Sequence, residues 1–152
     1  MSTQVVSTDF WEAQLPEDWV HKEAEPSQEV YFEAPDHTAG VYISTWRIAD
    51  ESLQKALQTT RAVELKHLPA PRSGFWQVVS STPIEDTPEI DARAEYFNRA
   101  DQYRIVSRLL GRGDKYIRVT FHDYGCSDRA RSARRSEPIV DSFMLRGQSV
   151  TC

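Results

Sequence analysis

The chain has 152 residues, 39% of them hydrophobic and 27% charged, which is the composition of a folded globular protein rather than of a disordered or membrane-embedded one. Its net charge of −5 argues against a general nucleic-acid binder, and no stretch approaches the roughly 20 apolar residues of a membrane span. We expect one domain over residues 1–152, with loose tails at 1–8 and 147–152.

The start of the chain predicts a cytoplasmic location. Residues 1–4 lack both the basic and the apolar part of a secretion signal, and two cysteines, Cys126 and Cys152, suit a compartment in which thiols stay reduced. Charge is unevenly placed: residues 1–60 hold 11 acidic and 3 basic side chains, and residues 61–152 hold 12 and 15. This polarity could steer a charged partner, or it reflects solvated surfaces that happen to segregate.

The first third of the chain indicates short strands broken by turns. Residues 10–15 predict a strand that stops at Pro16. Two further strands, at 30–34 and 40–48, are separated by a short segment of turn residues, so we expect them to pair as a hairpin.

A helix is predicted over about 50–67. Asp50 can cap its start, and Leu53, Ala56 and Leu57 begin an apolar stripe at helical spacing. Pro69 forbids continuation. Strands at 75–81 and 91–99 follow, separated by a loop at 83–90 in which two prolines remove backbone donors.

A second hairpin is predicted from strands at 103–110 and 114–124. A three-residue loop with Gly113 in the left-handed conformation would pair Arg108 with Tyr116. That register places one apolar set on a single face of the sheet, which we expect to be the core: Ile105, Ser107, Leu109, Ile117, Val119 and Phe121.

The C-terminal part predicts one kinked helix or two helical pieces across about 127–145, because Pro138 is tolerated only near a helix start. Strands joined by short loops cannot be parallel. The predicted fold class is therefore α+β, with a mainly antiparallel sheet of about six or seven strands flanked by helices.

The segment Leu15-Pro16-Glu17-Asp18-Trp19 is similar to the Leu-Pro-x-x-Trp turn that ends the first strand in many members of the Mog1/PsbP-like superfamily, which includes the bacterial DUF1795/DcrB-type proteins. The order of the elements also resembles that superfamily. The resemblance implies a sandwich fold and a generally non-catalytic role, as in a Ran-binding import factor, photosystem subunits and chaperones of type VI secretion effectors. The chain departs from the lipoprotein members in lacking an N-terminal lipobox cysteine.

The most enzyme-like cluster is Cys126 with His122 and Asp123, because a thiolate nucleophile needs a base and an orienting group. The alternative is a strand-end histidine beside a small buried thiol, and we expect no catalytic residue. His21, His37 and His67 lack the spacing of a zinc site, so no metal and no cofactor are expected.

Candidate binding residues are aromatic and basic. Trp46 and Trp76 lie on predicted strands and should belong to the core, whereas Trp11 and Trp19, near acidic residues, are expected to be exposed contacts. The basic run of the last helix offers Arg131, Arg134 and Arg135, although a charged helix face can be merely solvated. A second docking patch would form if three strand arginines are exposed together: Arg104, Arg108 and Arg118.

These patterns favour a non-enzymatic protein-binding module, an adaptor or chaperone for a secreted, type VI-like effector in a bacterial cytoplasm. An immunity protein that neutralises a cognate toxin is the first alternative, since the acidic first third would suit a basic toxin. A small Cys/His enzyme is the second. The expected partner is another protein, with no nucleic acid and no membrane insertion, and an exposed sheet face or edge could also pair two copies of the chain.

Overall fold

A computed structural model describes residues 2–22 and 29–147 of the chain. In chain order its elements are β1 (Thr3–Ser7), β2 (Trp11–Pro16), β3 (Val20–Lys22), β4 (Glu29–Glu33), β5 (Ala39–Arg47), α1 (Leu53–Lys66), β6 (Gln77–Ser81), β7 (Glu89–Asn98), β8 (Tyr103–Arg112), β9 (Lys115–Asp123), α2 (Arg129–Asp141) and β10 (Met144–Leu145).

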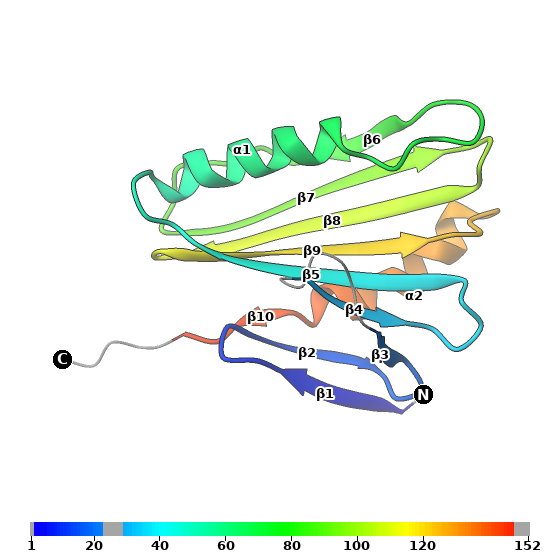
Figure 1. The fold of residues 1–152 in the computed structure, drawn as a ribbon, viewed down its shortest axis with the longest axis horizontal. Coiled ribbons are helices and arrows are strands. Elements are labelled where there is room, and N and C mark those ends of the chain that lie inside the picture. Colours follow the sequence, from blue (N-terminus) through cyan, green and yellow to red (C-terminus); the bar gives the residue numbers. More distant parts are fainter. Residues whose placement is uncertain (1, 23–28, 148–152) are drawn as a thin grey trace.

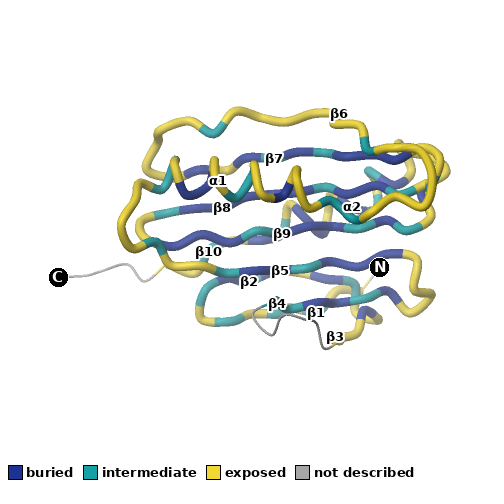
Figure 2. Tube along the Cα trace, turned by 45° about the horizontal axis from the view of Figure 1, so that its top comes forward, coloured by how far each residue is buried: buried dark blue, intermediate teal, exposed yellow. Residues whose placement is uncertain are grey.

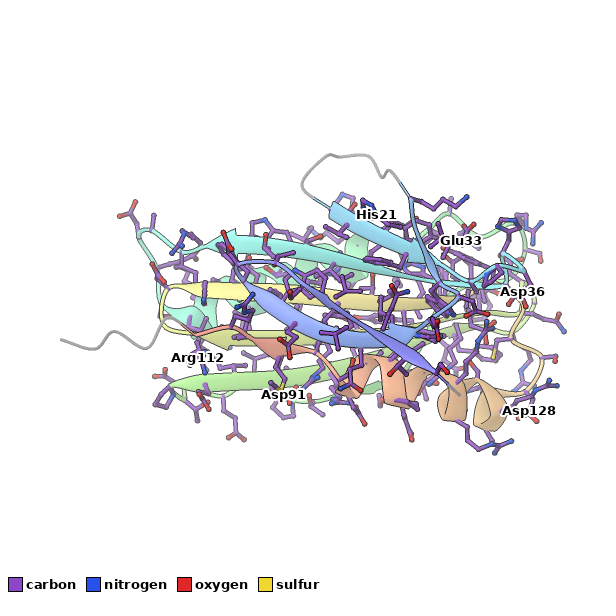
Figure 3. All side chains as sticks on the ribbon, turned by 90° about the horizontal axis from the view of Figure 1, so that it is seen from below. His21, Glu33, Asp36, Asp91, Arg112 and Asp128 are labelled. Atoms are coloured by element: carbon purple, nitrogen blue, oxygen red, sulfur yellow. The ribbon has the colours of Figure 1, made fainter. Side chains whose placement is uncertain are left out.

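The elements form two antiparallel sheets. The large sheet has seven strands in the order β3-β4-β5-β9-β8-β7-β6, and the small sheet has three in the order β1-β2-β10. Helix α1 packs on β8 and β9 from one side, whereas α2 and the small sheet cover the other side (Figure 1). Seen from below, the small sheet and α2 lie over the large sheet (Figure 3). The α+β class and the mainly antiparallel sheet are therefore confirmed.

Helix α1 begins at Leu53, three residues after the expected start. The side chain of Ser52, not of Asp50, caps it by accepting a hydrogen bond from the backbone N–H of Lys55 at 3.1 Å. Its buried face includes Ala56 and Leu57, as the apolar spacing predicts.

The β8–β9 hairpin has a different register from the expected one. Its loop is only Gly113 and Asp114, with Gly113 at φ 65°, and Arg108 pairs with Val119 rather than with Tyr116. The shift is three residues, and because side chains alternate along a strand, an odd shift moves them to the other face. Leu109 consequently faces α1, whereas Ile117 and Val119 face the small sheet and α2.

The large sheet is covered on both faces, so two apolar layers exist. The main core lies between the large sheet, the small sheet and α2, and includes Leu15, Phe121 and Phe143. A thinner layer beneath α1 includes Leu57 and Leu109. Buried positions run along the central strands β5, β9, β8 and β7, whereas edge strand β6 is mostly exposed (Figure 2).

The N-terminal residues differ from the loose tail expected there. Residues 3–7 are strand β1, which pairs with β2 along its whole length; Val5 at its centre lies opposite Gln14. The expectation for 147–152 falls almost wholly outside the described residues, as does Cys152. Helix α2 is one helix capped by Asp128, with Pro138 inside it. Neither helix in the described part of the chain is long and apolar enough to span a membrane.

Candidate functional site

Three of the four tryptophans are placed in the opposite way from that expected, whereas Trp76, expected in the core, is partly buried and packs against the cluster of Ala94, Tyr96 and Ile105. Trp11 and Trp19 are only 1% and 5% exposed, whereas Trp46 is 38% exposed. The small sheet is the reason: β2 turns its inward side chains onto the large sheet, and the Trp11 ring lies 5.3 Å from the ring of Phe143. Trp46 instead lies on the α1 side, stacked on Tyr116 beyond the cover of the helix.

Arg104 attaches α2 to the large sheet and is 3% exposed. Its Nε donates to Glu95 at 3.0 Å, and its Nη1 donates to the hydroxyls of Ser132 and Ser136 on α2 at 2.9 and 3.1 Å. An arginine that is engaged in this way is a buried structural contact and is not available to a partner.

Arg108 has the same role at the other end of α2. Its Nε and Nη2 donate to the two oxygens of Asp91 at 3.0 Å each, and its Nη1 donates to the backbone oxygens of Val140 and Phe143. These carbonyls lie at the C-terminal end of α2, where oxygen atoms lack partners within the helix. Arg108 thus neutralises a carboxylate and caps a helix at once.

Arg118 lies on the opposite face of the sheet from Arg104 and Arg108. Its Nε donates to Glu64 of α1 at 2.7 Å. The three arginines expected to form one exposed patch are therefore divided between the two faces, and two of them are buried. That docking patch does not exist.

A groove forms where the small sheet, the β4–β5 loop and α2 meet, and we call it the α2 groove. Its volume is about 640 Å³. Its apolar lining comes from three prolines and two largely buried side chains: Pro16, Pro35, Pro138, Trp19 and Ile139. Prolines at the end of a strand, in a loop and in a helix present rigid apolar surface without a backbone donor.

The rim of the α2 groove is charged. Arg135 Nη1 donates to Thr38 Oγ1 at 2.9 Å, its Nη2 lies 3.8 Å from Asp36, and its guanidinium carbon is 5.8 Å from the centre of the Trp19 ring. Hydrogen bonds from Thr38, and then the charge of Arg135, hold the pKa of Asp36 below its usual value. Figure 3 places Asp36 at the same end of the molecule as Asp128, the cap of α2.

Three of the sequence-derived candidates meet in this groove: Trp19, Arg134 and Arg135. Arg131 is exposed on the same helix outside the lining, and Trp11 is in the core. The sequence did not identify Pro35, Asp36 and Pro138 as binding residues, because proline and aspartate are equally typical of a turn or a helix start. The rim also carries Asp18 and Asp36, and Asp36 lies beside Arg135, so the basic part of the rim is at Arg134 on α2. A concave apolar surface with a basic group on one side can hold a segment of another protein that combines an apolar side chain with an acidic neighbour.

The thiol and imidazole of the expected enzyme-like cluster are not assembled. His122 points to the α1 side, where its Nδ1 meets the hydroxyl of Tyr103 at 2.7 Å. Cys126 is 2% exposed beside Ser132 on the α2 side, and burial raises the pKa of its thiol. A nucleophilic cysteine needs the reverse shift, so this geometry does not support thiolate chemistry.

No protein-family model matches the sequence, and no curated protein matches it. Solved structures do. Cyanobacterial PsbP (CyanoP) from Synechocystis sp. PCC 6803 is similar with a TM-score of 0.72 at 13% identity, over 95% of this chain and 93% of that one. The Ran-binding protein Mog1p of Saccharomyces cerevisiae is similar with a TM-score of 0.57 at 10% identity, over the whole of both chains.

This chain has the Mog1/PsbP-like fold. A protein from Bacteroides thetaiotaomicron VPI-5482 shares it with a TM-score of 0.53 at 15% identity, and there the likeness covers 93% of this chain but 47% of the other. In this chain the turn at Leu15–Trp19 has two structural roles. Leu15 enters the main core, and Trp19 reaches the lining of the α2 groove.

Proposed function

We propose that the chain is a non-enzymatic protein-binding module of the DUF1795/DcrB type, an adaptor or chaperone for a secreted, type VI-like effector in a bacterial cytoplasm. The α2 groove is the place where it holds its partner. The observation that carries this proposal is the combination of the apolar lining around Trp19 with the basic side chains of Arg134 and Arg135 at its rim. Mog1p, which has the same fold, is named as a Ran-binding protein, and this supports a binding role.

The partner segment follows from the groove. An apolar side chain fills the space beside Pro16, Pro35 and Pro138, and acidic neighbours face Arg134 and the exposed Arg131. Contacts of this kind at an interface rim act mainly on the association rate, whereas the apolar anchor acts on the dissociation rate.

The test begins with affinity purification of the tagged chain from its native cells, followed by kinetic binding measurements on the protein recovered in stoichiometric amount. Arg134→Glu should slow association about tenfold at low salt, and less at high salt. Arg99→Glu is the matched control, because Arg99 is exposed in the β7–β8 turn, does not line the groove, and changes the net charge equally. It should bind as the parent chain does.

Equal association of both variants would remove the α2 groove from the proposal. Failure to recover any stoichiometric protein partner would contradict the binding module as a whole. If the recovered partner is a toxin whose activity the chain blocks, the role is that of an immunity protein, and the groove variants then report on inhibition instead of delivery.

A further inference from the structure

A second hollow, of about 280 Å³, lies on the α1 side of the large sheet, beside the C-terminal end of the helix. We call it the sheet pocket. Its lining includes Glu29, Tyr42, Tyr103, Arg118 and His122, which come from four neighbouring strands. The protein-binding role proposed for the α2 groove does not use it.

The strand register explains why a hollow exists here. Glu29, Ser44 and Arg118 form one row across β4, β5 and β9, each paired with the next. Neighbouring strands lie about 4.8 Å apart, so the backbones of the outer two residues are roughly 10 Å apart. The residue between them has a short side chain, which leaves space between two long charged ones.

The two charged side chains of this row, Glu29 and Arg118, have other partners. Arg118 donates to Glu64, but Glu64 is also paired with Arg61 at 3.4 Å, so two guanidinium groups share one buried carboxylate. Glu29 accepts a hydrogen bond from Ser44 Oγ at 3.1 Å, and within the described residues it forms no ion pair with Arg118. Glu64 also lines the sheet pocket, so one end holds the Arg118 guanidinium beside a carboxylate that it shares with Arg61, and Glu29 supplies a second carboxylate at the other end.

Aromatic side chains also line the sheet pocket. The Tyr42 and His122 rings form a T-shaped pair at 5.0 Å between centroids, and the Tyr103 hydroxyl is hydrogen-bonded to His122 Nδ1. Burial, and then the charge of Arg118, lowers the pKa of His122 to about 3, so the imidazole adds no charge at neutral pH. Leu68 and Ile105 complete the lining with apolar surface.

We propose that the sheet pocket binds a free α-amino acid with an apolar side chain. The carboxylate pairs with the Arg118 guanidinium, the ammonium group pairs with Glu29 near the face of Tyr42, and the side chain packs on Leu68 and Ile105. A ligand with only one charge leaves the other end of the pocket unsatisfied, and that is the source of the selectivity. The volume lies just below the range of drug-sized ligand sites and suits a molecule of this size.

Calorimetric titration of the full chain with L-phenylalanine tests the proposal, alongside 3-phenylpropanoate, which lacks the ammonium group, and phenethylamine, which lacks the carboxylate. L-phenylalanine should bind saturably, and each analogue should bind about tenfold to a hundredfold more weakly, as expected for loss of one charge-assisted contact. Glu29→Gln should weaken L-phenylalanine binding by the same factor and leave 3-phenylpropanoate unaffected. Glu137→Gln, exposed on α2, is the matched control and should change nothing.

Three results would overturn the proposal: no saturable binding of L-phenylalanine, equal binding of L-phenylalanine and 3-phenylpropanoate, or undiminished L-phenylalanine binding by Glu29→Gln. The comparison of ligands on the unmodified chain decides the matter even if that variant folds poorly. Because the α2 groove plays no part in it, this test can fail or succeed independently of the protein-binding role.

Discussion

Tyr31 lies over the backbone of Gly40 on the adjacent strand, with its ring stacked on Tyr42 at 4.2 Å between centroids. Its hydroxyl donates to Glu33 and meets that of Tyr124 at 3.1 Å. A Cβ atom at position 40 would overlap the Tyr31 ring, so the absence of a side chain there is what admits the tyrosine. The sequence placed Gly40 at the start of a predicted strand, directly after a turn, and indicated nothing of this contact.

Gly40→Ala should therefore destabilise the fold by about 1–3 kcal/mol, the usual cost of forcing extra volume into a packed site. Gly125→Ala is the control, because nothing lies within 4 Å of a Cβ atom there and its φ is not in the left-handed region. Urea unfolding of both variants measures the difference. A Gly40→Ala variant as stable as the Gly125→Ala variant would show that Tyr31 moves aside without cost.

Glu64 is a buried charged residue whose burial the helical pattern of the sequence does not reveal. It is 4% exposed, and it accepts hydrogen bonds from Ser107 Oγ at 2.6 Å and from Arg118 Nε at 2.7 Å. In the sequence, Glu64 occupies a position on the apolar stripe of α1. A charged residue at such a position is normally interpreted as the exposed edge of the stripe. Its partners on β7, β8 and β9, Tyr96, Ser107 and Arg118, together with Arg61 of α1, offset the cost of burying this charge.

At the scale of the element, α2 is attached to the sheet by charged groups as well as by its apolar face. Burial would raise the pKa of Asp91 and of Glu95, but the hydrogen bonds and charges of Arg108 and Arg104 outweigh it, and both pKa values lie below their usual range. A carboxyl group whose pKa is lowered by folding stabilises the protein above its unfolded pKa, and that contribution is lost as the pH falls through the folded value.

The free energy of unfolding should thus begin to fall below about pH 6.5, because unfolding lets the buried His122 imidazole take up a proton, and it should fall further below about pH 4, given unfolded carboxyl pKa values near 3.9 and 4.3. The double variant Asp91→Asn, Glu95→Gln should be less stable at pH 7 and decline less steeply in acid. The slope should not vanish, because the pKa of Asp101 is lowered as well. Urea unfolding at a series of pH values measures both effects.

The matched control for that experiment is the double variant Asp50→Asn, Glu51→Gln, which neutralises two exposed acids ahead of α1. It should follow the pH profile of the parent chain. If the Asp91 and Glu95 variant also follows the parent profile, the arginine pairs contribute nothing to the acid sensitivity of the fold.

At the scale of the whole molecule, the main core is closed by segments from both ends of the chain. Phe143, 1% exposed, follows α2 and packs against Trp11 of β2, and strand β10 pairs with β2 directly after it. Contacts between residues so far apart in sequence carry a loop-closure cost in conformational entropy, which burial in this core must offset.

Phe143→Ala should cost about 3–5 kcal/mol, because it leaves a cavity where three layers meet. Phe75→Ala makes the same chemical change at a side chain that is 80% exposed, and it should alter stability by less than about 0.5 kcal/mol. Thermal and urea unfolding of the two variants provide the comparison. Similar losses in both would mean that the small sheet and α2 do not form one core with the large sheet.

The sequence by itself determined the local elements and the fold class. The stripe from Leu53 to Leu57 predicted α1, the segment of turn residues after Ala34 predicted the β4–β5 hairpin, and Gly113 marked the later turn; all three are confirmed. Each depends on residues a few positions apart, where helix periodicity and turn chemistry act directly.

Only the tertiary structure decided which faces are buried and which polar groups are used. Both faces of the large sheet are covered, so alternation along β8 and β9 could not show which side is the core, and a loop one residue shorter changed the register. Trp11 is buried because its own strand, β2, turns it onto the large sheet and Phe143, and Arg104 because Glu95 lies on the neighbouring strand. Such pairings join distant parts of the chain, and no local pattern encodes them.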